Sequence, residues 1–390
     1  MKTRVALAFL LLSAGSTFAA IPFDCGRGIP LQKAIDFVPP GETLVLYGAC
    51  RGPLVISKHL TLASDSKATI TGDGKDAITV NGPRRVTLKG LSVEGGYNGV
   101  VGSSGAQLTI LDSSIHGNKL NGIFLANSAA TISGSSTSGN CNNGLDAEAS
   151  SAVILSGAYS STSNGVFGVN INASSSLAFS QAQVTVSGNI LGIQIATSAS
   201  AFISDPLTVL TVKKNLTTGL TIVSGAHMVA FGGTIKATGN GVHGVSVDSK
   251  AGLDLDAAAA LTASGNKQDG VHLEETSVLT MFNTPAFSGA QGTTTVTAEN
   301  NGQNGISVLT GSNLTVIHQA LIMSSANSMN GIQADNGSAI TLILSTVTGN
   351  TRKDVAPSFG SRADITTSAI GTLSCDATVL LRGGLTCPRP

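Results

Sequence analysis

Gly117–Leu125 contains the pattern that most constrains this chain, because it recurs along most of the sequence. The pattern is Gly-Asn, three variable residues, glycine, a branched apolar residue, any residue and a second apolar residue. Regular recurrence at a period of this size predicts a solenoid built from stacked units. The second glycine returns at intervals of 22 to 35 residues, as Gly99, Gly122, Gly144, Gly168, Gly192, Gly219, Gly244, Gly270, Gly305 and Gly331.

Each repeat predicts three short strands and a tight polar turn. Apolar and polar residues alternate after the glycine, as at Ile123 and Leu125, which indicates a strand with one buried face. Two further apolar runs follow in each unit, such as 108–110 and then Ile115. Asn usually stands four residues before the glycine, as at Asn118, where its amide is expected to pair with the amide stacked above it. The glycine itself is expected where a corner leaves no space for Cβ.

The composition agrees with thin strands and tight turns. The chain has 47 glycines, no tryptophan, 4 % aromatic residues and only 11 % charged residues. The 22 Lys and Arg residues are balanced by 22 Asp and Glu residues, so no net field attracts nucleic acid or an anionic membrane. We therefore expect neither of these partners.

The N-terminus has the features of a secretory signal peptide over residues 1–19. Lys2 and Arg4 precede the apolar run 5–14, and Ala19 occupies a small-residue cleavage position. The run is far shorter than the roughly 20 apolar residues that span a bilayer, so we expect no transmembrane segment. These features predict a secreted protein, extracellular or periplasmic.

Five cysteines in a secreted chain predict disulfides at its two ends. We expect Cys25 to pair with Cys50 and Cys375 to pair with Cys387. Cys141 remains, and because it follows a turn Asn it is interpreted as a small residue beside a corner, not as a catalytic thiol.

The ends of the solenoid are expected to differ from its body. Pro30–Val38 has apolar residues at helical spacing and is followed by Pro39-Pro40-Gly41, so it predicts a short helix that caps the exposed end of the stack. The expected divisions are an N-terminal cap with irregular coils over 20–64, β-helix repeats over 65–374 and a disulfide-closed tail over 375–390. About 12 turns at the spacing of parallel strands are expected.

These features together resemble the right-handed parallel β-helix family, the pectate-lyase-like superfamily. The helical cap, the Pro-Pro-Gly stop, the Gly-Asn turns and the Gly-Ile-x-Leu strand starts carry the resemblance, which covers essentially all of the mature chain. It implies an all-β fold, a single right-handed parallel β-helix. It does not choose an activity, because the family includes lyases, hydrolases, esterases, epimerases, tailspikes and non-enzymatic surface proteins.

The chemistry that the resemblance implies is only partly present. Lyases of the family use acidic calcium ligands with an Arg or Lys base, whereas this chain has no arginine between Arg85 and Arg352. Its hydrolases use paired Asp residues, and no such pair is found in the body. A lyase with a central Arg base is therefore disfavoured.

One segment, 248–275, holds eight charged residues in 28 and is the only local acidic excess. Alternation places Asp248 on the outer face of one turn and His272 and Glu274 on that of the next. About 5 Å apart, the two carboxylates could share a cation or raise each other's pKa, with His272 as the proton carrier. We take Asp248, His272 and Glu274 as candidate catalytic residues and Asp248 and Glu274 as candidate metal ligands, with calcium the candidate ion. A solvated charged face is the alternative.

A second outward row is formed by Asp146, Glu148, Asn170 and Asn172. These side chains are candidate substrate-binding residues that would hydrogen-bond sugar hydroxyls along the rod, although polar residues are also expected wherever a strand faces water. By contrast His116, His243 and His318 are interpreted as isolated surface or turn residues.

Three functions remain open from the sequence. A non-enzymatic surface, matrix or binding scaffold is favoured, because no complete catalytic motif is found. The alternative is a polysaccharide-active enzyme, a lyase, hydrolase or epimerase acting on an acidic glycan. A periplasmic binding or maturation factor is the second alternative, and an extended polysaccharide is the expected partner of the first two.

Overall fold

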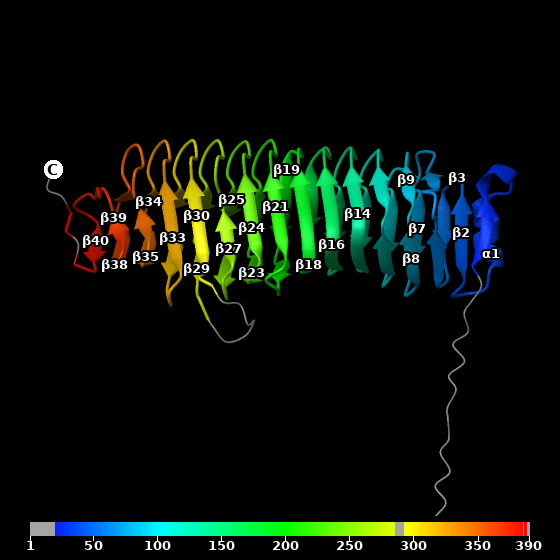
Figure 1. The fold of residues 1–390 in the computed structure, drawn as a ribbon, viewed down its shortest axis with the longest axis horizontal. Helices are drawn as coiled ribbons and strands as arrows, with labels where there is room; N and C mark the ends of the chain where they lie inside the picture. Colours follow the sequence, from blue (N-terminus) through cyan, green and yellow to red (C-terminus); the bar gives the residue numbers. More distant parts are fainter. Residues whose placement is uncertain (1–19, 285–291, 385, 388–390) are drawn as a thin grey trace, which may run out of the picture.

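Parallel strands stack into an elongated rod in the computed structural model, which describes residues 20–284, 292–384 and 386–387 (Figure 1). One wall of the rod is a 13-stranded parallel sheet, called sheet B here. Its strands are β4 (Leu54–Ile56), β7 (Ile78–Asn81), β10 (Val100–Ser103), β13 (Ile123–Ala126), β15 (Leu145–Glu148), β17 (Phe167–Ile171), β19 (Leu191–Ala196), β22 (Leu220–Val223), β25 (Val245–Val247), β28 (Val271–Leu273), β31 (Ile306–Val308), β34 (Ile332–Ala334) and β37 (Val355–Pro357).

The remaining walls belong to a 27-stranded parallel sheet, called sheet A, which runs in two rows. The first row is β1 (Ile21–Asp24), β2 (Thr43–Tyr47), β5 (Leu60–Ala63), β8 (Arg85–Lys89), β11 (Gln107–Leu111), β14 (Ala129–Ser138), β16 (Ala152–Thr162), β18 (Ser176–Ser187), β20 (Ser200–Ile203), β23 (His227–Phe231), β26 (Gly252–Asp256), β29 (Val278–Met281), β32 (Asn313–Val316), β35 (Ala339–Ile343), β38 (Arg362–Thr366) and β40 (Leu380–Arg382). The second row is β3 (Ala49–Arg51), β6 (Thr69–Thr71), β9 (Ser92–Glu94), β12 (Ser114–His116), β21 (Val209–Lys213), β24 (Thr234–Thr238), β27 (Ala260–Thr262), β30 (Thr295–Glu299), β33 (Leu321–Ser325), β36 (Thr346–Val347) and β39 (Ala369–Ile370). In β14, β16 and β18 one bent strand serves both rows, so each turn of the chain supplies three β segments as predicted.

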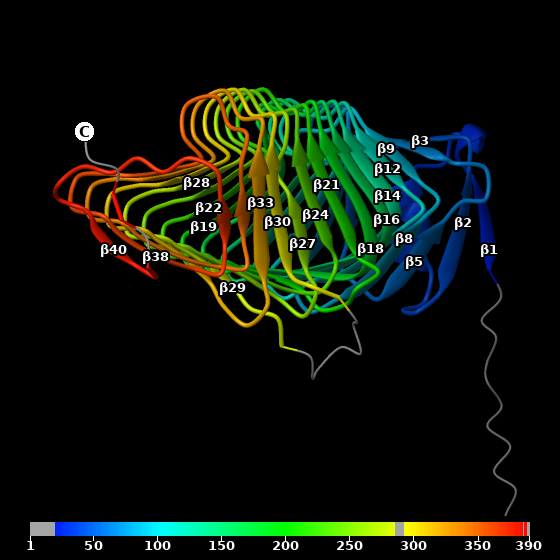
Figure 2. The same ribbon diagram turned by 60° about the vertical axis from the view of Figure 1, so that its left-hand side comes forward.

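Equivalent residues of successive repeats lie directly beside one another. Ile123 pairs in register with Leu145, which pairs with Val169, and all three side chains point into the core with no exposed surface. Figure 2 shows the turns stacked along the rod, with sheet B and sheet A enclosing one continuous interior. The predicted alternation of buried and outward residues is therefore confirmed, and thirteen strands of sheet B exceed the expected twelve or so turns.

A ladder of asparagines holds the predicted corner together. The backbone N–H and the Nδ2 of Asn118 both donate to Oδ1 of Asn140 on the next rung, at 3.1 and 2.9 Å. The same pair of bonds links the later rungs as far as Asn350. The repeat glycine lies against this ladder: a Cβ on Gly122 would approach the carbonyl oxygen of Gly144 to 2.6 Å and Nδ2 of Asn140 to 2.8 Å. Both predictions about the corner are confirmed, because a buried amide needs its partner and the close contact excludes a side chain.

The N-terminal end is closed by the predicted helix. α1 (Leu31–Phe37) is preceded by a single 3₁₀ turn, Cys25–Arg27, and buries Leu31 and Ile35 against the end of the core. Both predicted disulfides are present, Cys25–Cys50 and Cys375–Cys387. Disulfides are compatible with an extracellular or periplasmic location. The predicted signal peptide, residues 1–19, lies outside the described residues, and within the described part no helix is long and apolar enough to cross a membrane.

Candidate functional site

The outer face of sheet B carries two aligned columns of side chains. The central column contains the outward residue at the middle of each strand, which in the repeats from Gly99 to Gly331 stands two positions after the glycine. Its members pair in register from strand to strand: Val55, Thr79, Val101, Phe124, Asp146, Asn170, Gln194, Thr221, Ser246, His272, Ser307, Gln333 and Ala356. The pre-glycine column contains the residue just before each glycine: Asn98, Asn121, Asn143, Phe167, Leu191, Thr218, His243, Asp269, Asn304 and Asn330. Polar groups gather at two places along these columns.

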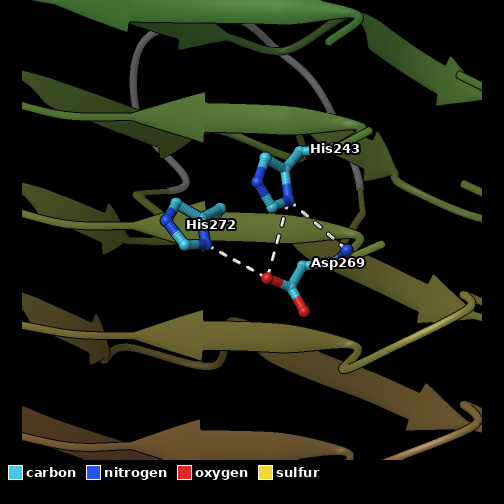
Figure 3. A group of neighbouring side chains, drawn as sticks. All are labelled: His243, Asp269 and His272. Atoms are coloured by element: carbon cyan, nitrogen blue, oxygen red, sulfur yellow. Dashed lines mark hydrogen bonds and ion pairs between the residues drawn. The ribbon is translucent and has the colours of Figure 1, made fainter. Parts of the chain in front are cut away.

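The first place is the His272 cluster, formed by His243, Asp248, Asp269, His272 and Glu274. His272 lies at the centre of β28, and its Nδ1 is 3.0 Å from Oδ2 of Asp269. Its other ring nitrogen, Nε2, is 3.3 Å from Oε2 of Glu274. The imidazole of His243, from the preceding rung, stacks on His272 with ring centroids 4.3 Å apart (Figure 3). His272 is therefore held in position from three sides.

Asp269 is the buried support of this cluster, with its side chain only 4 % exposed. Its Oδ1 accepts hydrogen bonds from the backbone N–H of Asn304 at 2.9 Å and from Nδ2 of the same residue at 3.0 Å. Its Oδ2 is hydrogen-bonded to Nδ1 of His272 and also lies 3.5 Å from Nδ1 of His243. Burial alone would raise the pKa of Asp269, but these hydrogen bonds and imidazoles outweigh it and lower the pKa.

The two imidazoles have pKa values shifted in opposite directions. Burial and the neighbouring His272 lower the pKa of His243 to about 4, so this ring is neutral at pH 7. Burial also opposes the charged form of His272, but its hydrogen bond to Asp269 and the surrounding carboxylates raise its pKa. A stacked pair of imidazoles with separated pKa values is an arrangement typical of functional sites.

Asp248 completes the open side of the cluster. Its Oδ2 accepts a hydrogen bond from Oγ of Ser246 at 2.7 Å, whereas its Oδ1 is enclosed and has no hydrogen-bond partner among the residues that the structure describes. Burial raises the pKa of Asp248 despite the Ser246 bond. One oxygen of Asp248, a nitrogen of His272 and one oxygen of Glu274 lie within 4.8 Å of one another, so the structure brings the three predicted site residues together.

Two members of the cluster were missed by sequence reasoning. His243 was expected to be an isolated surface or turn residue, and that expectation is wrong: its side chain is 14 % exposed and contacts Asp269 and His272. Asp269 was counted among the charges of its segment without a role. Both stand in the pre-glycine column, where most repeats have an amide or an apolar residue, so comparison of the repeats at that position could have found them.

The second place is the Asp146 cluster, formed by Asn121, Asn143, Asp146, Glu148 and Asn170. Oδ1 of Asp146 accepts a hydrogen bond from Nδ2 of Asn170 at 2.8 Å, and Oδ2 accepts a longer one, 3.4 Å, from Nδ2 of Asn121. Burial raises the pKa of Asp146, although the amides of Asn170 and Asn143 act to lower it. Oδ1 of Asn170 is enclosed and has no hydrogen-bond partner in residues 20–284, 292–384 and 386–387.

Not every predicted substrate-binding residue is free to bind. Asp146 is 5 % exposed and Asn170 is 7 % exposed, so these outward residues are covered by their neighbours and are not simply solvated. Asn172 uses its Oδ1 to accept the N–H of Ala173 at 2.8 Å. Glu148, at the end of β15, is more accessible than Asp146.

Known proteins support the fold. Residues 62–207 match the family model described as "Right handed beta helix region". The chain has the fold of a right-handed parallel β-helix. No curated protein matches its sequence.

Three solved structures illustrate the likeness of this β-helix. The A-module of Azotobacter vinelandii mannuronan C-5 epimerase AlgE6 is 16 % identical, with a TM-score of 0.45, and 92 % of this chain aligns with 94 % of that one. Pectate lyase Pel9A is 14 % identical, with a TM-score of 0.33, over 74 % of this chain and 70 % of the other. A tailspike protein of E. coli bacteriophage HK620, in complex with a pentasaccharide, is 10 % identical, with a TM-score of 0.39, over 93 % and 80 %. These likenesses concern the path of the backbone only.

The electrostatics of sheet B limit what the β-helix can bind there. Along its described strands the central column contains no Lys or Arg, and its charged positions are Asp146 and the titrating His272. Asp248 and Glu274 add carboxylates at the edge of the same face. This face therefore offers hydrogen-bond acceptors and an imidazole, which suit hydroxyl groups, amines or cations better than bare anions.

Proposed function

We propose that this β-helix is a secreted polysaccharide-active enzyme, in which an extended glycan lies along the outer face of sheet B and reacts at Asp248, His272 and Glu274. The observation that carries the proposal is the hydrogen bond from His272 to the buried Asp269. This bond fixes the imidazole between two more accessible carboxylates, those of Asp248 and Glu274. Burial of the Asp269 carboxylate costs desolvation free energy, and a purely structural strand has no evident need of it. A solvated charged face would not be expected to bury its carboxylate at 4 % exposure.

The length of sheet B supports an extended ligand. Asp146 and His272 are five rungs apart in the central column, a distance of roughly 24 Å at the spacing of parallel strands. We assign the Asp146 cluster to binding, because Glu148 offers an accessible acceptor to sugar hydroxyls, and we assign the His272 cluster to reaction. A polymer would be needed to reach both.

The charge of the face guides the choice of substrates. An acidic glycan would meet carboxylates without Lys or Arg partners along the described central column, so it would need a divalent cation between the two sets of negative charges. Pectate and alginate should therefore be assayed with and without divalent cations, beside neutral and amine-bearing glycans. New reducing ends, unsaturated uronates detected by absorbance, and changes of sugar configuration detected by NMR cover hydrolase, lyase and epimerase activity.

Substitutions then test the assignment. On any glycan that is turned over, His272→Gln and Asp248→Asn are expected to lower kcat by at least about 100-fold, the typical contribution of one acid or base. Asp254→Asn is the matched control, because Asp254 also binds a histidine, with Oδ2 3.0 Å from Nε2 of His227, but lies on sheet A. It is expected to leave turnover unchanged.

The outcome separates the enzyme from the scaffold. Turnover that survives in both His272→Gln and Asp248→Asn would refute the site. Absence of any turnover and of any glycan binding across the panel would refute the proposed function and leave the scaffold, which the sequence alone favours.

A further inference from the structure

His272 is arranged as a histidine metal ligand usually is. Its Nδ1 is engaged by Asp269 at 3.0 Å, and Asp269 is in turn held by two hydrogen bonds from Asn304. Metal-binding histidines commonly donate their second ring nitrogen to a carboxylate, which fixes the tautomer and the ring orientation. The arrangement leaves Nε2 of His272 directed to the accessible side of the cluster, toward Glu274.

Two carboxylates meet this nitrogen from neighbouring rungs. Ser246 and His272 pair in register between β25 and β28, and Asp248 and Glu274 each follow two positions later on the same face. The backbone ladder continues through them, since the N–H of Asp248 donates to Ile222 and that of Glu274 to Val247. The rigid strand pair therefore brings the three ligand atoms within 4.8 Å of one another.

The second oxygen of the Asp248 carboxylate, Oδ1, is enclosed in a way that favours a bound cation. Within the described part of the chain Oδ1 of Asp248 has no hydrogen bond, although the other oxygen of the carboxylate, Oδ2, accepts one from Ser246. A buried carboxylate oxygen without a donor is costly, and a cation satisfies it as well as a hydrogen bond does.

The donor set selects the class of ion. We propose that Asp248, His272 and Glu274 bind a divalent transition-metal ion such as Zn²⁺ or Mn²⁺, with His272 coordinating through Nε2 and Asp269 acting as its positioning residue. One imidazole with two carboxylates suits these ions, whereas Ca²⁺ takes six to eight oxygen ligands and no nitrogen. Asp248 and Glu274 alone predict calcium, whereas the addition of the His272 nitrogen to the ligand set favours a transition-metal ion.

A second group of potential ligands, His243, Asp269 and His272, is less suited to an ion. Asp269 is 4 % exposed and already accepts Asn304 and His272, so its oxygens are occupied. It serves better as the support of His272. Three protein ligands leave coordination positions open, which is the usual form of a site that also admits a substrate group or water.

Ion binding is measured directly and needs no glycan, so its failure is distinguishable from failure of the proposed function. The full chain, made without a polyhistidine tag and freed of metal with a chelator, is titrated calorimetrically with Zn²⁺, Mn²⁺ and Ca²⁺. We expect one equivalent of Zn²⁺ or Mn²⁺ to bind and to raise the thermal unfolding temperature. His272→Gln and Asp248→Asn should abolish this binding, while each variant keeps the circular dichroism of the parent chain.

The role of Asp269 and the specificity of the site have their own tests. Asp269→Asn should weaken binding by about 10- to 100-fold and shift the visible absorption of the Co²⁺-loaded protein, a change that a purely structural role would not produce. His227→Gln, which removes a histidine that pairs with Asp254 on sheet A, is the control and should bind the ion unchanged. No binding of either transition metal, equal binding by His272→Gln, or Ca²⁺ binding as tight as Zn²⁺ would each overturn the proposal.

Discussion

The Asp146 and His272 clusters use the same positions of the repeat for different chemistry. At Asp146 the central column holds the carboxylate and the pre-glycine residue, Asn143, is an amide. At His272 the order is reversed, since the central residue is an imidazole and the pre-glycine residue, Asp269, is the carboxylate. Both carboxylates are nearly inaccessible, yet the pKa of Asp146 is raised and that of Asp269 is lowered.

The difference arises from the neighbouring rungs. Asp269 receives two hydrogen bonds from Asn304 on the following rung and one from His272. The residue that corresponds to Asn304 beside the Asp146 cluster is Phe167, whose side chain has no donor. Asp146 therefore depends on neutral amides, and those of Asn170 and Asn143 do not offset the effect of burial on its pKa. In this solenoid the hydrogen-bond donors on the neighbouring rung therefore decide whether the pKa of a buried acid is lowered or raised.

The largest effect is expected from removing each carboxylate. Asp269→Ala leaves the imidazole of His272 and the amide of Asn304 without their buried acceptor, and should lower the free energy of unfolding by about 3 kcal/mol. Asp146→Ala also removes the cost of a poorly solvated charge, so its loss should be about 1 kcal/mol or less. Urea unfolding at pH 7 measures both. Equal losses would show that the two carboxylates do not differ as described.

The pH dependence of stability sharpens the same contrast. The folded-state pKa of Asp146 is raised, so the ionised carboxylate lowers the free energy of unfolding at pH values above that pKa. This destabilisation disappears as the pH falls through the folded-state pKa to below the unfolded value near 3.9. Asp146→Asn is therefore expected to be more stable than the parent chain at pH 7, by about 1 kcal/mol or less. Near pH 3 the two should unfold at the same urea concentration. An Asn variant that is less stable at pH 7 would contradict this sign.

The smallest effect is expected at the accessible edge of the His272 cluster. The side chain of Glu274 is 44 % exposed, so Glu274→Gln should change the unfolding free energy by no more than about 0.5 kcal/mol. The same substitution should weaken Zn²⁺ or Mn²⁺ binding in the calorimetric titration, because an amide is a poorer ligand than a carboxylate. A large stability loss with unchanged ion affinity would make Glu274 a structural residue.

The sequence by itself determined the architecture of this protein. The glycine at each corner, the alternation after it and the Asn before it are local signals, and each repeat restates them, so the strands, the amide ladder and the inward residues such as Ile123 follow from one unit. The pairings Cys25–Cys50 and Cys375–Cys387 and the capping helix also followed, because they concern neighbouring segments at the ends of the chain. Even the meeting of Asp248, His272 and Glu274 could be predicted, since one period separates their rungs.

Only the tertiary structure decided which of these site residues are buried and held by hydrogen bonds from neighbouring rungs. The path of the turn before each strand places the pre-glycine column beside the central one, and this is what brings Asp269 and His243 against His272. The neighbouring side chains on this face also leave Asp146 and Asn170 nearly inaccessible to solvent, although both occupy outward positions on their strands. Burial and hydrogen bonding between rungs set pKa values and orient rings, and these depend on side chains about 25 to 35 residues away, which alternation within one strand does not encode.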